Sequence, residues 1–485
     1  MSAAAQSPLY IKIAESLTQQ MKRGTLRGGD RAPSLRQLSQ QRGVSMSTAL
    51  QAYLWLESRG YLEARPQSGF YVRTPYSSLI AEPKFESARA HAPVGSTNAL
   101  WSDILKAVAD PANIPFGAGT ASPELYPNRR LSLIMRRIIH REPLHSARYV
   151  FPPGLEELRR QIARRAASGG CTLAPSDIIV TCGALEAINL CLRAVARPGD
   201  VIAVESPTFF GILESATSIG LKIVEIPTHP QEGMDLAELD RAIKKHRVKA
   251  CITMPNCHNP LGFVLADAHK KSLVDLTARA NVALIEDDIY GDLAFSGHRP
   301  RTAKAFDRKG LVLLCSSFSK ILTPGMRLGW VSAGRYQGEV EHLKFVSTVA
   351  SGSLAQETVA EFLSSGGYER HLKKLRLTLA GQVDCARQAI AKYFPEGTRI
   401  SRPSGGHMLW LELPARIDAL KLYRAALAER ITVLPGPIFS VTGRYKNYIR
   451  INCGHRWTEE HDRALLTLGR LAERVGSRTT KAPTY

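Results

Sequence analysis

SSFSKILTPGMRLGW, residues 316–330, is the most informative segment of this 485-residue chain. It places Lys320 in a serine-rich turn, directly after the apolar segment LVLLC and shortly before Arg327. A lysine in such a turn can form a Schiff base with an aldehyde cofactor, while nearby hydroxyl groups and a guanidinium hold a phosphate. A single lysine is more often an ordinary surface residue, so this interpretation depends on the segments that precede it.

Other segments of matching chemistry also follow apolar runs. In chain order they are VTCGALEAINL with Gly183, ESPTFFGIL with Phe209, MPNCHNPLGF with Asn259, and VALIEDDIYGDL with Asp287 and Tyr290. Backbone N–H groups at a helix start can bind a phosphate, and a carboxylate at a strand end can keep a pyridine nitrogen protonated. Each segment alone is weak, since the acidic run at 286–288 also suits a solvated loop or a Mg²⁺ site. Their common order makes the set specific.

The same region predicts the fold class. The apolar runs DIIVTC, DVIAVE, ACITMP, VALIED and LVLLCSS are short, are bounded by Asp, Pro or Gly, and alternate with helical stretches. This pattern is typical of an α/β domain whose mainly parallel sheet is covered on both faces. We expect that domain over residues 98–475, with a smaller C-terminal α+β subdomain at about 370–475.

Residues 1–75 predict a separate basic domain, with ten Lys and Arg residues against four acidic ones, a charge of +6. Apolar residues at helical spacing indicate a first helix that ends near Gly24. Ser34 and Ser45 can cap two shorter helices joined by a turn at Gly43. The strands YLEARP and GFYVR then form a hairpin around Pro66-Gln67-Ser68-Gly69. The segment therefore reads as a helix-turn-helix followed by a wing.

Such a domain suits double-stranded DNA, because its second short helix can enter a major groove and its cations can contact phosphates. The alternative is a small helical adaptor domain. The candidate DNA-binding residues are Arg36, Ser45, Ser47, Thr48, Gln51, Arg65 and Gly69. Between the two domains, residues 76–97 are rich in Ser, Ala, Pro and Gly and lack hydrophobic periodicity, which predicts a moderately flexible linker.

Composition sets further bounds. Hydrophobic residues make up 44% and charged residues 22%, which excludes a disordered chain, and the net charge is +21. The eight cysteines form no CxxC pair, so a reduced cytoplasmic compartment is expected. Cys251, Cys257 and His258 come closest to a metal cluster, but buried thiols are the favoured interpretation and no metal is expected. No signal peptide or membrane span is predicted.

Residues 8–72 resemble the winged helix-turn-helix domain of the GntR family of bacterial repressors. The resemblance rests on LYIKIAESL, GDRAPSLRQLSQQRGVS and ESRGYLEARPQSGFYV, in that order. One position departs from the family: Met46 stands directly after the GVS turn, where relatives often carry Arg. An operator preference borrowed from those relatives therefore does not carry over.

Residues 100–475 resemble the fold-type I pyridoxal-phosphate aminotransferases. The resemblance implies that Lys320 holds pyridoxal 5'-phosphate, that Asp287 pairs with its ring nitrogen, and that Tyr290 is a further catalytic residue. It also implies ring contacts from Asn259 and Phe209. The implied phosphate ligands are Gly183, Ala184, Ser317, Ser319 and Arg327, with Tyr149 in RYVFPPGLEELRRQIARR reaching the phosphate of the partner subunit.

Two further implications concern individual positions of the large domain. In YIRINCG, Arg450 matches the arginine that grips an amino acid's α-carboxylate. At the phosphate turn, relatives usually carry Gln where this chain has Leu185-Glu186. Since an acid beside a phosphate is unfavourable, we expect Glu186 to point away and Arg327 to contribute more to phosphate binding.

A GntR-type domain linked to an aminotransferase-like domain resembles the MocR subfamily of transcriptional regulators. This implies a homodimeric, pyridoxal-phosphate-dependent DNA-binding protein whose large domain senses the cofactor or an amino-acid-type or amine effector. The alternative is a working aminotransferase with an accessory DNA-binding domain, because Lys320, Asp287 and Tyr290 are all retained. At least a first half-transamination is chemically possible.

Overall fold

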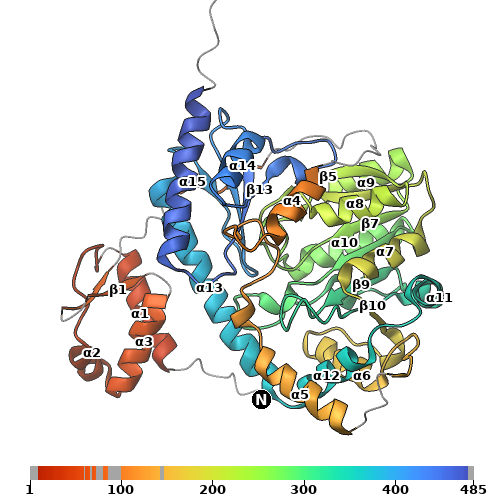
Figure 1. Cartoon of the computed structure of the whole chain (residues 1–485), viewed down its shortest axis with the longest axis horizontal. Helices are drawn as coiled ribbons and strands as arrows, with labels where there is room; N and C mark the ends of the chain where they lie inside the picture. The colour runs from red at the N-terminus through yellow and green to blue at the C-terminus, as the bar shows by residue number, and fades with distance from the viewer. Residues whose placement is uncertain are drawn as a thin grey trace, which may run out of the picture.

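A computed structural model describes residues 9–23, 25–58, 61–65, 68–72, 80–85, 100–141 and 147–478. The predicted helix end at Gly24, the wing residues Pro66 and Gln67, and most of the predicted linker lie outside these ranges. The described chain forms a small N-terminal domain and a larger α/β domain (Figure 1). None of the described helices is long and apolar enough to cross a membrane.

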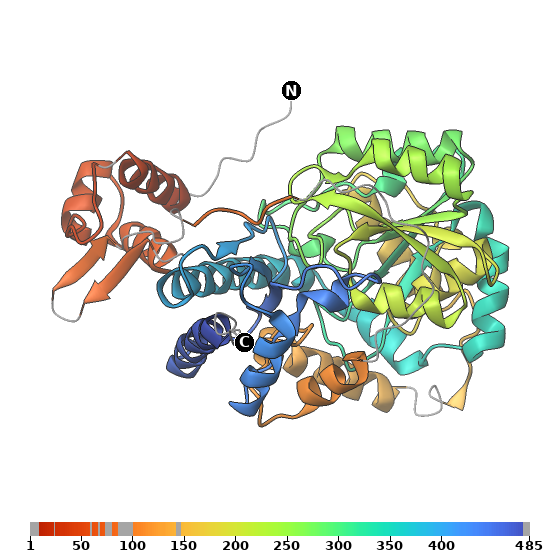
Figure 2. The same ribbon diagram turned by 90° about the horizontal axis from the view of Figure 1, so that it is seen from above.

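The N-terminal domain is a three-helix unit with a hairpin. Its elements are α1 (Leu9–Lys22), α2 (Leu35–Arg42), α3 (Met46–Ser58), β1 (Leu62–Arg65) and β2 (Gly69–Val72). The two strands are antiparallel and project from the helices as a wing (Figure 2). These elements confirm the predicted winged helix-turn-helix.

Local capping chemistry explains the helix boundaries. Ser34 Oγ accepts a hydrogen bond from Gln37 N at 3.2 Å, and Ser45 Oγ accepts one from Thr48 N at 3.1 Å. Gly43 ends α2 in the left-handed conformation at φ 61°, which glycine adopts without steric cost. Each cap is worth about 1 kcal/mol of helix stability.

The large domain is built on one eight-stranded sheet. Across the sheet the order is β3 (Ile179–Thr181), β10 (Gly329–Ser332), β9 (Val312–Ser317), β8 (Ala283–Asp287), β7 (Ala250–Thr253), β4 (Val201–Ser206), β5 (Lys222–His229) and β6 (Gly233–Met234). The strands from β9 to β5 run parallel, whereas β10 and β6 are antiparallel to their neighbours. The predicted mainly parallel sheet is confirmed.

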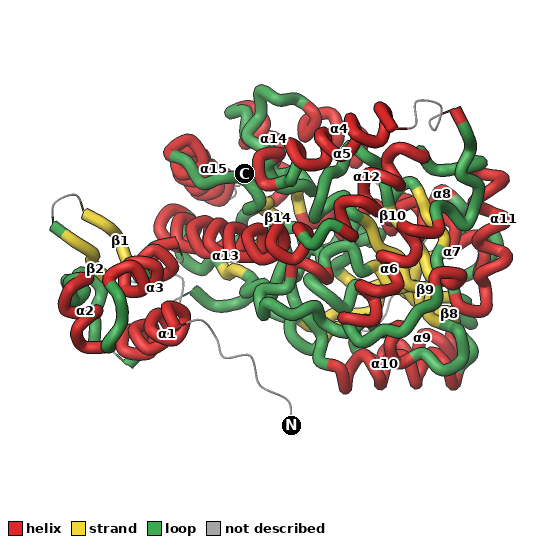
Figure 3. The backbone as a smooth tube through the Cα atoms, turned by 90° about the horizontal axis from the view of Figure 1, so that it is seen from below, coloured by secondary structure: helices red, strands yellow, loops and turns green. Residues whose placement is uncertain are grey.

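Helices cover both faces of this sheet, and each face has its own apolar core (Figure 3). One face packs against α9 (Leu236–His246) and α10 (Asp267–Arg279). The helices whose residues join the opposite core are α5 (Asn128–Arg141), α6 (Glu156–Ser168), α7 (Ala184–Val195), α8 (Phe210–Ser218), α11 (Gln337–Thr348), α12 (Ser353–Ser364) and the first half of α13 (Gly367–Tyr393).

The smaller subdomain contains a four-stranded antiparallel sheet in the order β11 (Arg399–Ile400), β12 (Met408–Glu412), β14 (Tyr448–Asn452) and β13 (Leu434–Pro435). Its helices are α13 (Gly367–Tyr393), α14 (Ala419–Ala428) and α15 (Glu459–Arg478). Ile104 of α4 (Leu100–Ala109) and Phe116 join the same core. The subdomain thus includes an N-terminal stretch outside its predicted range of about 370–475.

The described part of the predicted linker, residues 80–85, is docked on the large domain. Ile400 N donates a hydrogen bond to the Ala81 carbonyl at 3.0 Å, and Lys84 N donates one to the Glu412 carboxylate at 2.7 Å. The ring of Phe85 packs edge to face on His229, with centroids 5.0 Å apart. Residues 80–85 of the predicted linker are therefore in contact with the large domain, through a backbone hydrogen bond to β11, the Glu412 side chain of β12 and the His229 ring.

Candidate functional site

The predicted site residues converge at the carboxyl ends of the parallel strands, the edge where open α/β sheets bind ligands. A cavity of about 650 Å³ lies there, between the two subdomains. The predicted residues that line it are Ala184, Phe209, Asn259, Asp287, Tyr290, Ser319, Lys320, Arg327 and Arg450. Gly183, Ser317 and Tyr149 do not line it.

Lys320 is half-buried in the turn after β9. Its Nζ donates a hydrogen bond to the Gly119 carbonyl at 2.6 Å. Burial, together with the nearby positive charge of Arg450, lowers the pKa of Lys320 to about 8, while Asp287 opposes the shift. A lysine with such a pKa is neutral often enough near pH 7 to act as a nucleophile or a base.

Asp287 ends β8 and is 3% exposed. Its Oδ1 accepts a hydrogen bond from Ile289 N at 3.1 Å. Burial raises the pKa of this carboxyl to about 7, and the neighbouring Asp288 charge adds to the shift. A buried carboxyl of this kind is stabilised as an anion when a cationic ring nitrogen lies beside it.

Tyr290 and Asn259 line the same cavity and are both buried. The Tyr290 hydroxyl donates to the Gly119 carbonyl at 3.3 Å, and burial raises its pKa above the usual value. Asn259 Oδ1 has no hydrogen-bond partner among the described residues. An unpaired buried amide oxygen is costly, so this atom is available for a ligand.

The start of α7 forms an anion-binding corner. Gly183 caps the helix at φ 100°, and a Cβ at this position would lie 2.8 Å from Arg327 Nη2. Glycine is therefore required both by the backbone and by the close approach of the guanidinium. Arg327 is exposed and donates from Nη2 to the Cys182 carbonyl at 3.0 Å. The backbone N–H groups at the start of α7 and the Arg327 guanidinium thus lie close together, an arrangement that suits an anion.

Two predictions about this corner have different outcomes. Glu186 does point away, because its carboxylate accepts hydrogen bonds from Cys182 N at 2.6 Å and from Lys344 Nζ at 2.9 Å. Ser317, predicted to bind phosphate, has its hydroxyl 3.1 Å from the Leu328 carbonyl and 3.0 Å from Ser319 N. Ser317 makes these bonds inside the turn and is not among the residues that line the cavity, and its contact with a phosphate stays a prediction.

Arg450 is 1% exposed in β14 and sits at the base of the cavity. Its Nη2 donates to the carbonyls of Gly117 and Ala118 at 2.6 and 2.7 Å, while its Nε has no partner among the described residues. Burial lowers the pKa of Arg450 to about 10. A buried guanidinium held only by carbonyl groups is a strong site for a carboxylate.

The loop 117–120, which supplies these carbonyls, was missed by sequence reasoning. The only local signal is the Gly-Ala-Gly run between Pro115 and Pro123, which suggests a close approach of backbone but not its partner. His455 also lines the cavity and was not predicted. Burial lowers the pKa of His455 to about 4.

Tyr149 is 72% exposed and lies outside the cavity. Its ring contacts Phe151, with centroids 5.5 Å apart, and Phe151 in turn contacts Phe345 of α11 at 6.3 Å. All three rings are exposed. They form an aromatic surface of the kind found at protein–protein interfaces.

On the N-terminal domain, Arg36, Ser47, Gln51 and Gly69 are exposed. Ser45 Oγ lies 2.8 Å from both Ser47 Oγ and Thr48 Oγ1, so its main role is to cap α3. The start of the predicted groove-reading helix is therefore rich in hydroxyl groups and open to solvent.

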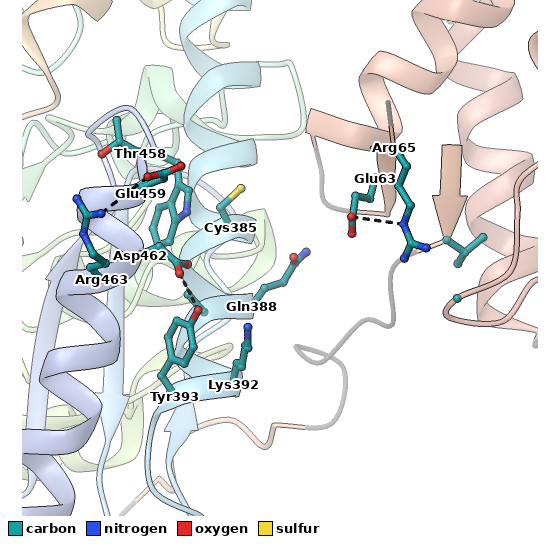
Figure 4. Close-up of a pocket in the computed structure, with 14 residues that line it drawn as sticks. Glu63, Arg65, Cys385, Gln388, Lys392, Tyr393, Thr458, Glu459, Asp462 and Arg463 are labelled. Atoms are coloured by element: carbon teal, nitrogen blue, oxygen red, sulfur yellow. Dashed lines mark hydrogen bonds and ion pairs between the residues drawn. The ribbon is translucent and has the colours of Figure 1, made fainter. Parts of the chain in front are cut away.

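A groove of about 900 Å³ lies between the wing and helices α13 and α15 (Figure 4). Glu63 and Arg65 face it from β1, and Asp462 of α15 accepts a hydrogen bond from the Tyr393 hydroxyl at 2.6 Å on the other side. Arg65 lies 3.6 Å from Glu63 and stacks over the Tyr71 ring at 4.3 Å. Half of its side chain stays exposed, so it can still reach DNA.

Comparisons with known proteins match both parts of the chain. The family of bacterial regulatory proteins named gntR matches residues 9–72, and the aminotransferase class I and II family matches residues 130–468. A protein of Escherichia coli K12 described as the uncharacterized HTH-type transcriptional regulator YdcR is 40% identical over 96% of this chain and 99% of its own length. The chain belongs to the MocR subfamily of GntR-type regulators.

A second regulator supports this assignment, and a solved enzyme supports the fold of the large domain. YjiR, another uncharacterized HTH-type transcriptional regulator of Escherichia coli K12, is 36% identical to this MocR-type chain over 96% of it and 99% of YjiR. Kynurenine aminotransferase from Pyrococcus horikoshii, solved in complex with PMP, superimposes with a TM-score of 0.72 at 27% identity. That match covers 80% of this chain and 96% of the enzyme.

The large domain of this MocR-type chain takes pyridoxal 5'-phosphate as its cofactor. The residues present fit this group: Asn259 Oδ1 has no partner among the described residues, burial raises the pKa of the Asp287 carboxyl, which a cationic ring nitrogen would lower, and the Arg327 guanidinium lies beside Gly183 at the start of α7. When bound, the cofactor supplies an electron sink and an aldehyde that a lysine can attack.

Proposed function

We propose that this chain is a pyridoxal-phosphate-dependent transcriptional regulator that binds promoter DNA and responds to a small molecule with an amino-acid-type head group. The observation that carries the proposal is the presence, in one chain, of a capped and exposed helix-turn-helix and of a cavity lined by Lys320, Asp287 and Arg450. A protein that only catalysed a reaction would not need the helix-turn-helix, and a protein that only bound DNA would not need this cavity.

The residue roles in the cofactor site follow from this proposal. Lys320 attaches the cofactor, Asp287 pairs with its ring nitrogen, and Tyr290 and Asn259 contact the ring oxygen. Phe209, half-buried at the start of α8, stacks on the ring. The phosphate ligands are Gly183, Ala184, Ser317, Ser319 and Arg327, all at the α7 corner or the lysine turn.

Arg450 grips the effector's α-carboxylate, because its unpaired Nε and its two carbonyl-bound N–H groups can turn to a carboxylate at one cavity wall. The effector would then replace the carbonyls of loop 117–120 as the partner of the guanidinium. Binding of a carboxylate is thus linked to movement of this loop.

The functional unit is a homodimer that acts in the cytoplasm. The support for a dimer is the exposed aromatic surface of Tyr149, Phe151 and Phe345, which a second copy would cover. In that dimer Tyr149 reaches the cofactor phosphate of the partner subunit. Sedimentation of the Tyr149→Ala and Phe151→Ala variants against the unchanged protein tests this assembly.

A second candidate function is amino-acid transamination. It is favoured by the lowered pKa of Lys320 beside a buried acid, since a neutral lysine in the cavity can move a proton. Steady-state product formation with 2-oxoglutarate as amino acceptor would support the enzyme. A single conversion of bound cofactor without turnover would support a sensor.

Footprinting on the DNA upstream of the chain's own reading frame tests the regulator. The full chain with pyridoxal phosphate should protect two half-sites, one for each subunit. The variant Arg36→Ala should lose protection at the same protein concentration, whereas Arg308→Ala, an exposed arginine of the large domain, should keep it. Equal protection along the whole fragment would contradict a specific operator.

A further inference from the structure

The charged side chains of the candidate cavity are few, and the proposed function uses every full charge among them. Lys320, Arg327 and Arg450 are its basic residues apart from a histidine, and Asp287 is its carboxylate, among the lining residues that the structure describes. In the proposed function Lys320, Arg327 and Asp287 contact the cofactor. Arg450 binds the ligand's α-carboxylate. Nothing charged is left for the ligand's own side chain.

His455 is the remaining basic side chain among the described residues that line the cavity. It is half-buried, its Nε2 has no hydrogen-bond partner among the described residues, and its ring stacks on His461 with centroids 6.2 Å apart. Burial and the neighbouring His461 lower the pKa of His455 to about 4, with Glu124 opposing the shift. Near pH 7 it therefore presents a neutral imidazole to a ligand.

The wall beside Arg450 is apolar. Leu434 of β13 pairs with Arg450 in the sheet register, and it is 2% exposed. Helix α4 adds Ile104, Leu105 and Val108, of which Val108 packs on Gly117, so that a Cβ there would lie 3.2 Å from Val108 Cγ2. Because Gly117 bonds to Arg450, this apolar wall adjoins the carboxylate site.

Leu105 is a solvent-exposed residue of this wall. It lines the cavity and yet is 46% exposed, whereas Ile104 on the same helix is buried in the subdomain core. An exposed leucine at a cavity mouth gains free energy when an apolar group covers it, about 25 cal/mol for each Å² removed from water. The wall therefore favours a ligand that carries its own apolar surface.

We propose that the ligand of this cavity is an amino acid with an uncharged, apolar or aromatic side chain, which lies against Leu105, Val108 and Leu434 while its carboxylate binds Arg450. The inference rests on the proposed function and names the ligand class of the same site. Acidic and basic amino acids are rejected because their side-chain charge would lose water without gaining a partner. The cavity thus favours uncharged amino acids because, among the described residues that line it, none with a full charge remains to pair with a charged ligand side chain.

The test is a ligand titration of the cofactor-bound full chain, followed by thermal unfolding. L-Leucine, L-methionine and L-phenylalanine should raise the melting temperature, since a ligand that binds only the native state stabilises it by mass action. L-Glutamate, L-aspartate and L-lysine should bind roughly tenfold more weakly or worse. Equal or tighter binding of the charged amino acids would overturn the proposal.

A substitution on the wall should change this preference. Leu105→Arg places a cation at the cavity mouth and should improve L-glutamate binding relative to L-leucine by about tenfold. Leu133→Arg is the matched control, because Leu133 of α5 is 52% exposed and does not line the cavity. An unchanged preference in Leu105→Arg, with Leu133→Arg also unchanged, would contradict the assignment of this wall.

The experiments distinguish a failure of the proposed ligand class from a failure of the proposed function. If none of these amino acids binds but the cofactor still controls DNA binding, the ligand class is wrong and the regulator stands. If the apolar amino acids bind but the full chain shows no specific DNA binding, the ligand class stands and the regulator is wrong.

Discussion

Lys320 Nζ lies 2.6 Å from the carbonyl oxygen of Gly119, more than two hundred residues earlier in the chain. The same carbonyl accepts from the Tyr290 hydroxyl at 3.3 Å, and the two preceding carbonyls hold Arg450. One short loop thus contacts three of the side chains proposed to bind cofactor and ligand. When cofactor and ligand bind these side chains, their hydrogen bonds to this loop would be exchanged for new ones.

Lys320→Ala should abolish covalent attachment of the cofactor. The unchanged protein should be yellow, and borohydride reduction should fix pyridoxal phosphate onto Lys320, as peptide mass spectrometry can detect. The reason is that this lysine is the one basic nitrogen at the centre of the cavity with a pKa lowered to about 8. Lys304→Ala, in the same domain but outside the cavity, is the control. Retention of the visible band in Lys320→Ala would contradict the assignment.

Asp287→Asn should weaken cofactor binding and slow any half-transamination, because the ring nitrogen loses the anion that keeps it protonated. Spectroscopic titration with pyridoxal phosphate measures the first effect. Stopped-flow conversion with L-leucine measures the second. Full conversion at the original rate would exclude the electronic role of Asp287.

Asp287 should also make the cofactor-free protein pH-sensitive. Its pKa is raised from 3.8 to about 7, so the folded protein holds this proton where the unfolded chain has released it. The free energy of unfolding should therefore fall as the pH rises from about 4 to 7, by a few kcal/mol for this group. Asp287→Asn should remove that slope in urea unfolding at several pH values. An identical slope in both proteins would show that Asp287 does not ionise as stated.

The docked segment 80–85 should protect backbone amides from hydrogen exchange. Lys84 N donates to Glu412, so Glu412→Ala should increase exchange at Lys84. Glu396→Ala, an exposed glutamate of the same subdomain, should leave it unchanged. Fast exchange at Lys84 in the unchanged protein would show that the segment is not held.

The winged domain and the strands could be predicted because their signals are local. Ser34, Gly43 and Ser45 specify helix ends by their own hydrogen bonds and backbone conformation, and the short apolar runs specify buried strands. The positions of Lys320 and Asp287 follow from the same runs, since Asp287 ends one strand and Lys320 lies in the turn after the next.

The missed features depend on partners far along the chain. Arg450 meets Ala118, which lies 332 residues earlier, and no periodicity links them. Residues 80–85 contain no helical or strand pattern, and their contacts are with distant parts of the chain, such as Ile400, Glu412 and His229. The resemblance implies a phosphate contact for Ser317, but the sequence gives no sign of the hydrogen bonds that its hydroxyl makes inside the turn, with the Leu328 carbonyl and Ser319 N.

Arg36→Ala should weaken DNA binding by roughly 1–3 kcal/mol if the side chain reads a base, and reduce the salt dependence if it contacts phosphate. Arg36 is exposed on α2, beside the hydroxyl-rich start of α3. Fluorescence anisotropy at two salt concentrations separates the two roles. An unchanged affinity at both would remove Arg36 from the interface.

The most direct test of the account is a mobility-shift titration of the full chain on its own upstream DNA at physiological salt, with and without pyridoxal phosphate. A pyridoxal-phosphate-dependent regulator should bind its own upstream DNA more tightly than random DNA. Its affinity for the upstream DNA should change when the cofactor is added. Binding no tighter than to random DNA under both conditions would contradict the regulator and leave transamination as the function of the large domain.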